Sequence, residues 1–177
     1  MLFFTDPLRT PTPWTTAARL PRGCGVVFRA FGAADAIERG RALAKVCRRR
    51  RLALLVGADP ALAARLNADG VHLPQRLAGR AGLVRALRAR FLVTAAAHDL
   101  PAALRARRAG VEALVISPIF ASNSPSAGRP IGARALARLA REARIPVYAL
   151  GGVNAGTARA LKLTGVVGLA AVEALEG

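Results

Sequence analysis

Residues 146–154 read Pro146-Val-Tyr-Ala-Leu-Gly-Gly-Val-Asn154, and a later stretch reads Gly165-Val-Val-Gly-Leu-Ala-Ala-Val172. Each holds a short apolar run typical of a buried strand, and the first run ends in a glycine pair ahead of a helix-forming segment. In a (β/α)8 barrel the loops after strands 7 and 8 commonly hold a substrate phosphate. Glycines let backbone N–H groups approach phosphate oxygens, and the following helix N-terminus adds a favourable dipole. We therefore expect a phosphate near Gly151, Gly152 and Gly168.

The rest of the chain alternates short β-branched or aromatic runs with alanine-rich helical segments. The expected strands are Leu2–Thr5, Gly25–Arg29, Leu52–Gly57, Gly70–Pro74, Phe91–Ala97, Ala113–Phe120, Val147–Gly151 and Val166–Val172. The expected helices are Trp14–Leu20, Ala33–Cys47, Pro60–Asn67, Ala81–Ala89, Pro101–Ala109, Ala133–Ala143 and Gly156–Leu163. This alternation favours parallel strands joined by helical crossovers. We predict a single compact (β/α)8 TIM barrel domain over residues 1–177, with an open, doubly wound sheet as the alternative because barrels usually need about 250 residues.

Bulk composition indicates a globular protein of the cytoplasm. The chain has 177 residues, is 53% hydrophobic and has a mean hydropathy of +0.32. No apolar run reaches the roughly eighteen residues of a membrane span, and the start, Met1-Leu-Phe-Phe-Thr-Asp6, lacks the basic region of a signal peptide. Cys24 and Cys47 have neither a metal-binding nor a redox spacing. We expect no contact with a membrane and a cytoplasmic location.

The formal net charge of +17 is extreme, and nearly all of it comes from arginine. One interpretation is nucleic-acid binding through phosphates. The other is that helix surfaces simply carry arginine, and it is favoured because no aromatic residues that could stack on bases lie among the clusters. We therefore expect no nucleic-acid partner. A basic surface would in either case steer small phosphorylated substrates toward the molecule.

Polar residues at the carboxyl ends of the expected strands are the candidates for chemistry, because barrel active sites lie at that end. They are Thr5, Asp6, Arg29, Asp59, Gln75, His98, Asp99, Ser117, Ser122, Asn123, Ser124 and Asn154. Several have a structural alternative: Asp59, Asp99 and Asn154 each precede a helix and suit its N-cap. The loop Ser122-Asn-Ser124 offers two hydroxyls and an amide to a phosphate, although turn formation would also explain it. His72 lies within a strand, where a structural role is favoured.

Several motifs together resemble one known family. Thr5-Asp6 follows the first strand, Ala68-Asp-Gly-Val-His-Leu-Pro-Gln75 covers the fourth, and Ser117-Pro-Ile-Phe-Ala-Ser-Asn-Ser124 covers the sixth. Pro130-Ile-Gly132 and the Gly151-Gly152 segment follow in the same order and spacing. The chain is similar to the thiamine phosphate synthase and TenI superfamily of (β/α)8 barrels.

The resemblance implies an activity and a cofactor. The synthase joins hydroxymethylpyrimidine diphosphate to a thiazole phosphate with Mg²⁺ and releases pyrophosphate, so its site must neutralise a departing diphosphate. On this resemblance Arg29 would bind the diphosphate. The family's Asn-Asp pair aligns with Gly57-Ala58, so Mg²⁺ would use Asp6 or Asp59, the acids that lie where a metal at the mouth could reach them. The resemblance implies that Gln75 contacts substrate.

The chain also departs from the family pattern. Gln-x-Arg-x-Lys becomes Val27-Phe-Arg-Ala-Phe31, a metal carboxylate becomes Leu77, and Thr-x-Thr-Lys becomes Ser122-Asn-Ser-Pro125. The histidine of TenI-type thiazole tautomerases aligns with Pro118, which leaves His98 as the candidate catalytic base.

Two classes of function stay open at this point: a synthase-like or tautomerase-like enzyme, and a non-catalytic barrel that binds a small phosphorylated ligand. A homo-oligomer is compatible with both.

Overall fold

Eight parallel strands close into a barrel in the computed structural model, which describes residues 1–122 and 128–173. The strands follow the chain order around the barrel, and β1 pairs with β8 to close it. They are β1 Leu2–Phe4, β2 Gly25–Phe28, β3 Ala53–Gly57, β4 Gly70–Leu73, β5 Leu92–Ala97, β6 Ala113–Ile116, β7 Val147–Ala149 and β8 Gly168–Ala171. Closure confirms the predicted barrel and rules out the open sheet.

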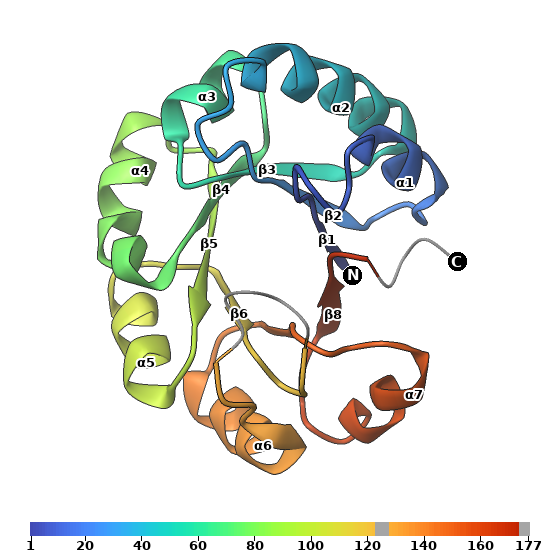
Figure 1. Ribbon diagram of the computed structural model, residues 1–177. Coiled ribbons are helices and arrows are strands. Elements are labelled where there is room, and N and C mark those ends of the chain that lie inside the picture. The colour runs from blue at the N-terminus through green and yellow to red at the C-terminus, as the bar shows by residue number, and fades with distance from the viewer. Residues whose placement is uncertain (123–127, 174–177) are drawn as a thin grey trace.

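Helices surround this barrel in chain order (Figure 1). They are α1 Pro13–Arg19, α2 Ala36–Arg50, α3 Pro60–Arg65, α4 Ala81–Leu87, α5 Leu100–Arg108, α6 Gly132–Ala143 and α7 Ala155–Ala158. Two 3-10 helices, Gln75–Arg80 and Arg159–Leu161, precede α4 and follow α7. The expected helix over Ala33–Cys47 begins three residues later, at Ala36, because two turns closed by Ala33 N to Ala30 O and Ala36 N to Ala33 O precede it.

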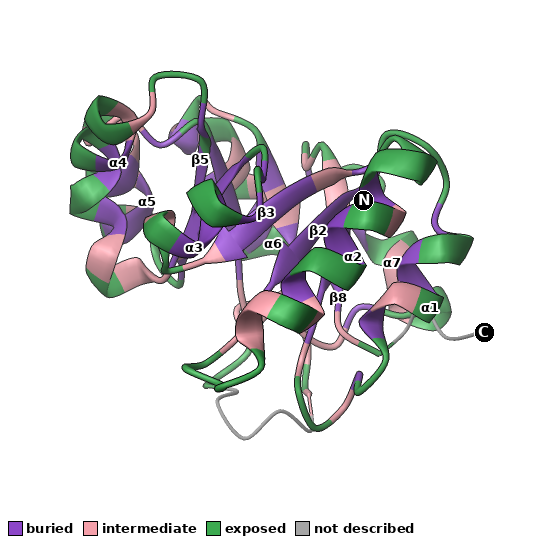
Figure 2. Ribbon diagram, turned by 90° about the horizontal axis from the view of Figure 1, so that it is seen from above, coloured by how far each residue is buried: buried purple, intermediate pink, exposed green. Residues whose placement is uncertain are grey.

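Strand residues alternate between two apolar clusters. On β1, Phe3 packs outward against the helices, whereas Leu2 and Phe4 point into the barrel. Figure 2 shows burial concentrated on the strands and on the helix faces turned toward them. Complete burial of a side chain such as Phe3 contributes about 1.5–3 kcal/mol, so the two faces of the sheet together stabilise the closed barrel.

Side chains just before three helices satisfy exposed backbone donors. Asp59 Oδ1 accepts from Leu62 N at 2.8 Å, and Asp99 Oδ1 accepts from Ala102 N at 2.7 Å. Asn154 caps α7 in the same manner. The N-cap interpretation of all three residues is therefore confirmed, and each cap fixes where the chain leaves the barrel rim.

Arginines gather in the last turns of helices. They include Arg19 of α1, Arg48, Arg49 and Arg50 of α2, Arg105, Arg107 and Arg108 of α5, and Arg141 of α6. A cation in the last turn interacts favourably with the helix dipole, which gives these residues a structural explanation. Among the described residues, no helix combines the length and apolarity needed to cross a bilayer.

Candidate functional site

Arg29 anchors a polar cluster at the carboxyl ends of β1 and β2. Its Nε donates to the carbonyl oxygen of Thr5 at 2.7 Å, and its Nη2 donates to Asp6 Oδ2 at 3.2 Å. Its backbone N–H donates to Thr5 Oγ1 at 3.0 Å. Two side-chain contacts with the neighbouring strand end therefore hold the guanidinium at the mouth, where the sequence predicts an anion-binding group.

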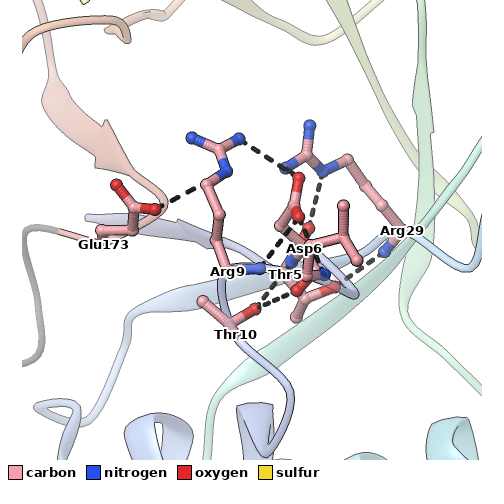
Figure 3. A network of polar contacts seen from close by, with 7 residues as sticks. Thr5, Asp6, Arg9, Thr10, Arg29 and Glu173 are labelled. Carbon is pink, nitrogen blue, oxygen red and sulfur yellow. Dashed lines mark hydrogen bonds and ion pairs between the residues drawn. The ribbon is translucent and has the colours of Figure 1, made fainter. Parts of the chain in front are cut away.

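Asp6 is the centre of this cluster (Figure 3). Its Oδ2 also accepts from Arg9 Nη2 at 3.2 Å, while its Oδ1 accepts from the backbone N–H groups of Leu8 and Arg9 at 3.1 and 3.2 Å. Each carboxylate oxygen thus accepts two hydrogen bonds, which uses its lone pairs. The residue forms ion pairs with two arginines and shapes the loop after β1.

Arg9 is a member of the cluster that sequence reasoning missed. Its Nε lies 3.7 Å from Glu173 Oε1, so the end of β8 joins the ends of β1 and β2. Thr10 locks the same loop, since its Oγ1 accepts from Asp6 N at 2.7 Å and donates to Asp6 O at 2.9 Å. The spacing Asp6-x-x-Arg9 is typical of an acid-capped turn and could have pointed to the pair.

The cluster shifts the pKa of both partners. Burial raises the pKa of Asp6, but the hydrogen bonds from Arg9 and Leu8 outweigh it, so the net pKa lies below the ordinary value of 3.8. Burial lowers the pKa of Arg29, and the charge of Asp6 opposes this effect. Both groups are charged at neutral pH, and Arg29 offers a permanent positive charge to a ligand.

His72 lies inside the barrel beneath this cluster. Its Nδ1 lies 2.9 Å from Thr94 Oγ1, and its ring meets the Phe4 ring edge to face at 5.0 Å. Burial, followed by the charge of Arg29, lowers the pKa of His72 to about 3. A neutral, buried and hydrogen-bonded ring has the structural role expected from the sequence.

His98 and Gln75 lie together at the ends of β5 and β4. Gln75 Oε1 accepts from the backbone N–H of His98 at 2.8 Å, and His98 Nδ1 contacts the carbonyl oxygen of Ser117. A carbonyl can only accept, so Nδ1 carries the proton and the lone pair of the neutral ring is on Nε2. The exposed ring can therefore act as a base through Nε2.

The glycine pair after β7 packs on the loop after β6. Gly151 has a φ of +93° and Gly152 a φ of +64°, and a Cβ on them would lie 2.8 Å from Pro118 Cα and 2.3 Å from the Ala121 carbonyl oxygen. The carbonyl of Gly151 also accepts from Phe120 N at 3.0 Å. Close packing of two loops is thus a first reason for glycine at both positions.

The helix after this pair offers less to an anion than its position suggests. Asn154 Oδ1 accepts from Gly156 N at 2.9 Å and from Thr157 N at 3.1 Å, so the cap itself occupies two donors of α7. Within the described residues, no hydrogen bond uses the N–H of Gly151 or Gly152. A phosphate contact from these two donors stays a prediction.

Gly168 does not lie where the sequence suggested. It is the first residue of β8, and a Cβ there would lie 2.8 Å from the Tyr148 ring and 3.8 Å from the Met1 nitrogen. The start of a strand is the end of the barrel opposite the mouth, so the prediction of Gly168 as a phosphate-binding residue is wrong. Its small size instead leaves room for Tyr148 inside the barrel.

The loop after β6 is described in part. Ser122 is half-buried, whereas Asn123 and Ser124 lie outside the described residues. A phosphate contact from this loop stays a prediction for all three residues.

The candidate magnesium ligands differ in their fit to a cation. Asp6 does not fit, because its oxygens already accept from Arg9, Arg29 and Leu8. Asp59 is exposed and uses Oδ1 for its cap, which leaves Oδ2 to face solvent. In the part of the chain that the structure describes, no three His, Cys, Asp or Glu side chains form a group that could hold a metal ion.

A cavity of about 70 Å³ lies between the loops after β1 and β2, with Thr5, Asp6, Arg29 and Arg39 in its lining. Small-molecule pockets usually measure about 300–1,000 Å³. This cavity is therefore too small to enclose an organic substrate.

Comparison with known proteins identifies relatives of this chain. A family model described as "Thiamine monophosphate synthase" matches residues 15–175. The thiamine-phosphate synthase of Chloroflexus aurantiacus is 36% identical over 140 residues, which cover 78% of this chain and 64% of the relative. That of Methylococcus capsulatus is 35% identical over 150 residues, or 82% of this chain and 65% of the relative. The chain thus spans less than two thirds of the length of these curated relatives.

The fold has a close counterpart among solved structures. Thiamine phosphate pyrophosphorylase from Pyrococcus furiosus superimposes with a TM-score of 0.82 at 24% identity, covering 97% of this chain and 84% of that one. The match supports the barrel architecture from β1 to β8. The family model over residues 15–175 shows that this chain belongs to the thiamine monophosphate synthase family.

Proposed function

We propose that this protein joins hydroxymethylpyrimidine diphosphate to a thiazole phosphate and releases pyrophosphate. The observation that carries the proposal is Arg29, a guanidinium fixed at the end of β2 by Thr5 and Asp6. It occupies the arginine position of the pattern that this chain shares with the synthase family.

The reaction needs such a group at this place. The bond between the methylene carbon and the diphosphate oxygen breaks, the electron pair leaves with pyrophosphate, and the thiazole nitrogen forms the new C–N bond. Negative charge grows on the departing oxygen, and a preorganised guanidinium stabilises that charge without having to reorient. Arg29 is preorganised because its Nε and Nη2 are already bound to Thr5 and Asp6.

The other half of the mouth suits the thiazole phosphate. The N–H groups of Gly151 and Gly152 are the proposed donors, and Ser122 is the proposed hydroxyl on the neighbouring loop. Gln75 and His98 lie between the two halves, just after β4 and β5. His98 Nε2 would accept a proton there, which also suits a tautomerase-like reaction.

The proposal includes Mg²⁺, held by fewer protein carboxylates than in the family pattern. Mg²⁺ often binds through one or two carboxylates plus substrate phosphates. Here Asp59 would supply the carboxylate, and Asp6 would serve Arg29 instead. When bound, the ion would neutralise diphosphate charge.

The test is synthesis of thiamine phosphate by the purified protein from both substrates and magnesium chloride. We expect turnover, and we expect Arg29→Ala to lower kcat/KM by roughly 100-fold, the size typical for loss of one charge-stabilising donor. Arg39→Ala is the matched control, because the two arginines have side-chain exposures of 25% and 26% and Arg39 belongs to α2. Absence of product from the unaltered protein, or an equal effect of both variants, would contradict the proposal.

A second candidate is a barrel that binds a phosphorylated ligand without turnover. It is favoured by Asp6, whose occupied oxygens remove one carboxylate from metal chemistry. It predicts a thermal shift with thiazole phosphate that is independent of magnesium and no product with both substrates. Both candidates use water-soluble phosphorylated metabolites, which suits the proposed cytoplasmic location.

A further inference from the structure

Phe31 is an exposed aromatic residue in a strained backbone conformation. Its residue exposure is 71% and its φ is +48°, a left-handed value that is rare for a bulky side chain. Gly32 follows with a φ of +78°, so the turn presents Phe31 immediately after the end of β2. A strained backbone conformation persists where packing or function requires it. Because the Phe31 side chain is exposed, packing around it does not explain the strain.

The neighbour of this ring is the anion-binding arginine. The Cζ atom of Arg29 lies 5.2 Å from the centre of the Phe31 ring and 5.7 Å from that of Phe4. Phe4 is buried in the barrel, whereas Phe31 is on the solvent side. A ligand that brings a phosphate to Arg29 therefore meets the Phe31 ring as well.

We infer that Phe31 contacts the substrate, stacking on a flat heteroaromatic ring whose diphosphate binds Arg29. The inference rests on the proposed function, and it adds a residue that replaces the lysine of the family pattern. A lysine at this position would contact only the diphosphate. With the Phe31 ring beside Arg29, the protein would recognise both the diphosphate and the heteroaromatic ring attached to it.

A purely supporting role for Phe31 makes a different prediction. If the ring merely orients the Arg29 guanidinium, its loss weakens every phosphate ligand equally. If it stacks on the substrate, its loss weakens ligands with an aromatic ring and spares inorganic pyrophosphate.

Calorimetric titration of two probes separates these roles. Inorganic pyrophosphate and hydroxymethylpyrimidine diphosphate are titrated into the unaltered protein, Phe31→Leu and Phe31→Tyr, with and without magnesium chloride. We expect the pyrimidine diphosphate to bind more tightly than pyrophosphate, and Phe31→Leu to weaken it about tenfold, as expected for loss of one aromatic stack. Phe31→Tyr should retain the affinity, and pyrophosphate binding should change less than about twofold.

Three results would overturn the inference: equal weakening of both probes, no change with either, or no preference of the unaltered protein for the pyrimidine probe. Turnover is measured separately on the same samples. If product forms but the ratio of the two probe affinities is unchanged in Phe31→Leu, the stacking role of Phe31 is refuted and the proposed synthase activity is retained. A ratio that falls in Phe31→Leu without any turnover supports the stack and refutes the synthase.

Phe31→Asn adds a readout that a structural role would not give. Asparagine tolerates the left-handed region, so relief of strain should raise Tm by about 2–4 °C while affinity for the pyrimidine probe falls. Arg51→Asn is the control, because Arg51 has a φ of +56° at the C-terminus of α2. It should show a similar rise in Tm and unchanged probe binding. A lower Tm for Phe31→Asn would show that the ring supports the fold.

Discussion

The Oδ2 atom of Asp6 accepts a hydrogen bond from Arg29 Nη2 at 3.2 Å, which joins the ends of the first two strands. The side chains of Asp6 and Arg29 are 15% and 25% exposed. At this partial burial the carboxylate both holds the guanidinium in place and compensates its desolvation.

Asp6→Asn should separate these effects. The amide oxygen can still accept from Leu8 and Arg9 N–H groups, but the charge that balances the guanidiniums is lost. We expect a decrease of about 1 kcal/mol in the free energy of unfolding, measured with urea, and a lower kcat with a smaller effect on KM. Glu142→Gln, which removes an exposed ion pair with Arg138, should leave both quantities unchanged.

The effect of Asp6→Asn on the free energy of unfolding should depend on pH. The folded-state pKa of Asp6 lies below its ordinary value of 3.8, so its stabilisation is complete above that pH and is lost as pH falls through the lower folded-state value. The stability difference between the unaltered protein and Asp6→Asn should therefore shrink below pH 4. A constant difference down to pH 2.5 would show that the carboxylate charge is not the cause.

His72 should control stability at higher pH. Its pKa is 6.5 in the ordinary state and about 3 when folded, so below pH 6.5 the unfolded chain takes up a proton that the folded chain refuses. We expect stability to fall by about 1.4 kcal/mol per pH unit from 6.5 toward 3 because of this residue. Urea titrations of His72→Asn, whose amide can still meet Thr94, should lack this slope. An unchanged slope would assign it to other groups.

The glycines after β7 should differ from other left-handed glycines in their tolerance of a methyl group. Gly152→Ala places a Cβ 2.3 Å from the Ala121 carbonyl oxygen in addition to straining the backbone, and we expect a loss of about 3 kcal/mol. Gly165 has a φ of +76° with nothing within 4 Å of its Cβ position. Gly165→Ala should therefore cost about 1 kcal/mol. Equal losses in urea unfolding would mean that the β6 and β7 loops move apart freely.

Of the two capping residues Asp59 and Asp99, only Asp59 should affect the magnesium dependence of turnover. Asp59 and Asp99 cap α3 and α5 with the same hydrogen bond, from the backbone N–H three residues on to Oδ1, and asparagine caps a helix about as well as aspartate. If Asp59 ligates Mg²⁺, Asp59→Asn should raise the magnesium concentration for half-maximal turnover about tenfold, while Asp99→Asn should not. A similar change in both variants would remove Asp59 from the metal site.

The barrel was predictable because its signals are local. Apolar runs mark all eight strands to within a few residues, and Asp59 and Asp99 mark helix starts through a capping preference that operates within four residues. The site was less predictable, because its contacts join distant segments. Arg29 was found from a motif, whereas the role of Arg9 depends on β8 closing against β1 and bringing Glu173 near.

Two errors have the same physical origin. Gly168 was assigned to a phosphate because glycine permits close approach of any neighbour, and the sequence does not say that the neighbour is the Tyr148 ring. Asp6 was assigned to a metal because carboxylates suit Mg²⁺, and the sequence does not show that two guanidiniums use its oxygens first.

Two different kinds of interaction hold the rim of this barrel together. Charged side chains tie β1, β2 and β8 together through Asp6 and Arg9, whereas backbone packing at Gly151 and Gly152 ties β6 to β7. A substitution of Gly151 or Gly152 alters shape without changing charge, whereas a substitution of Asp6 alters charge and also the backbone contacts of the loop after β1. The two halves of the rim therefore depend on different interactions, and a change in one half leaves the contacts of the other half in place.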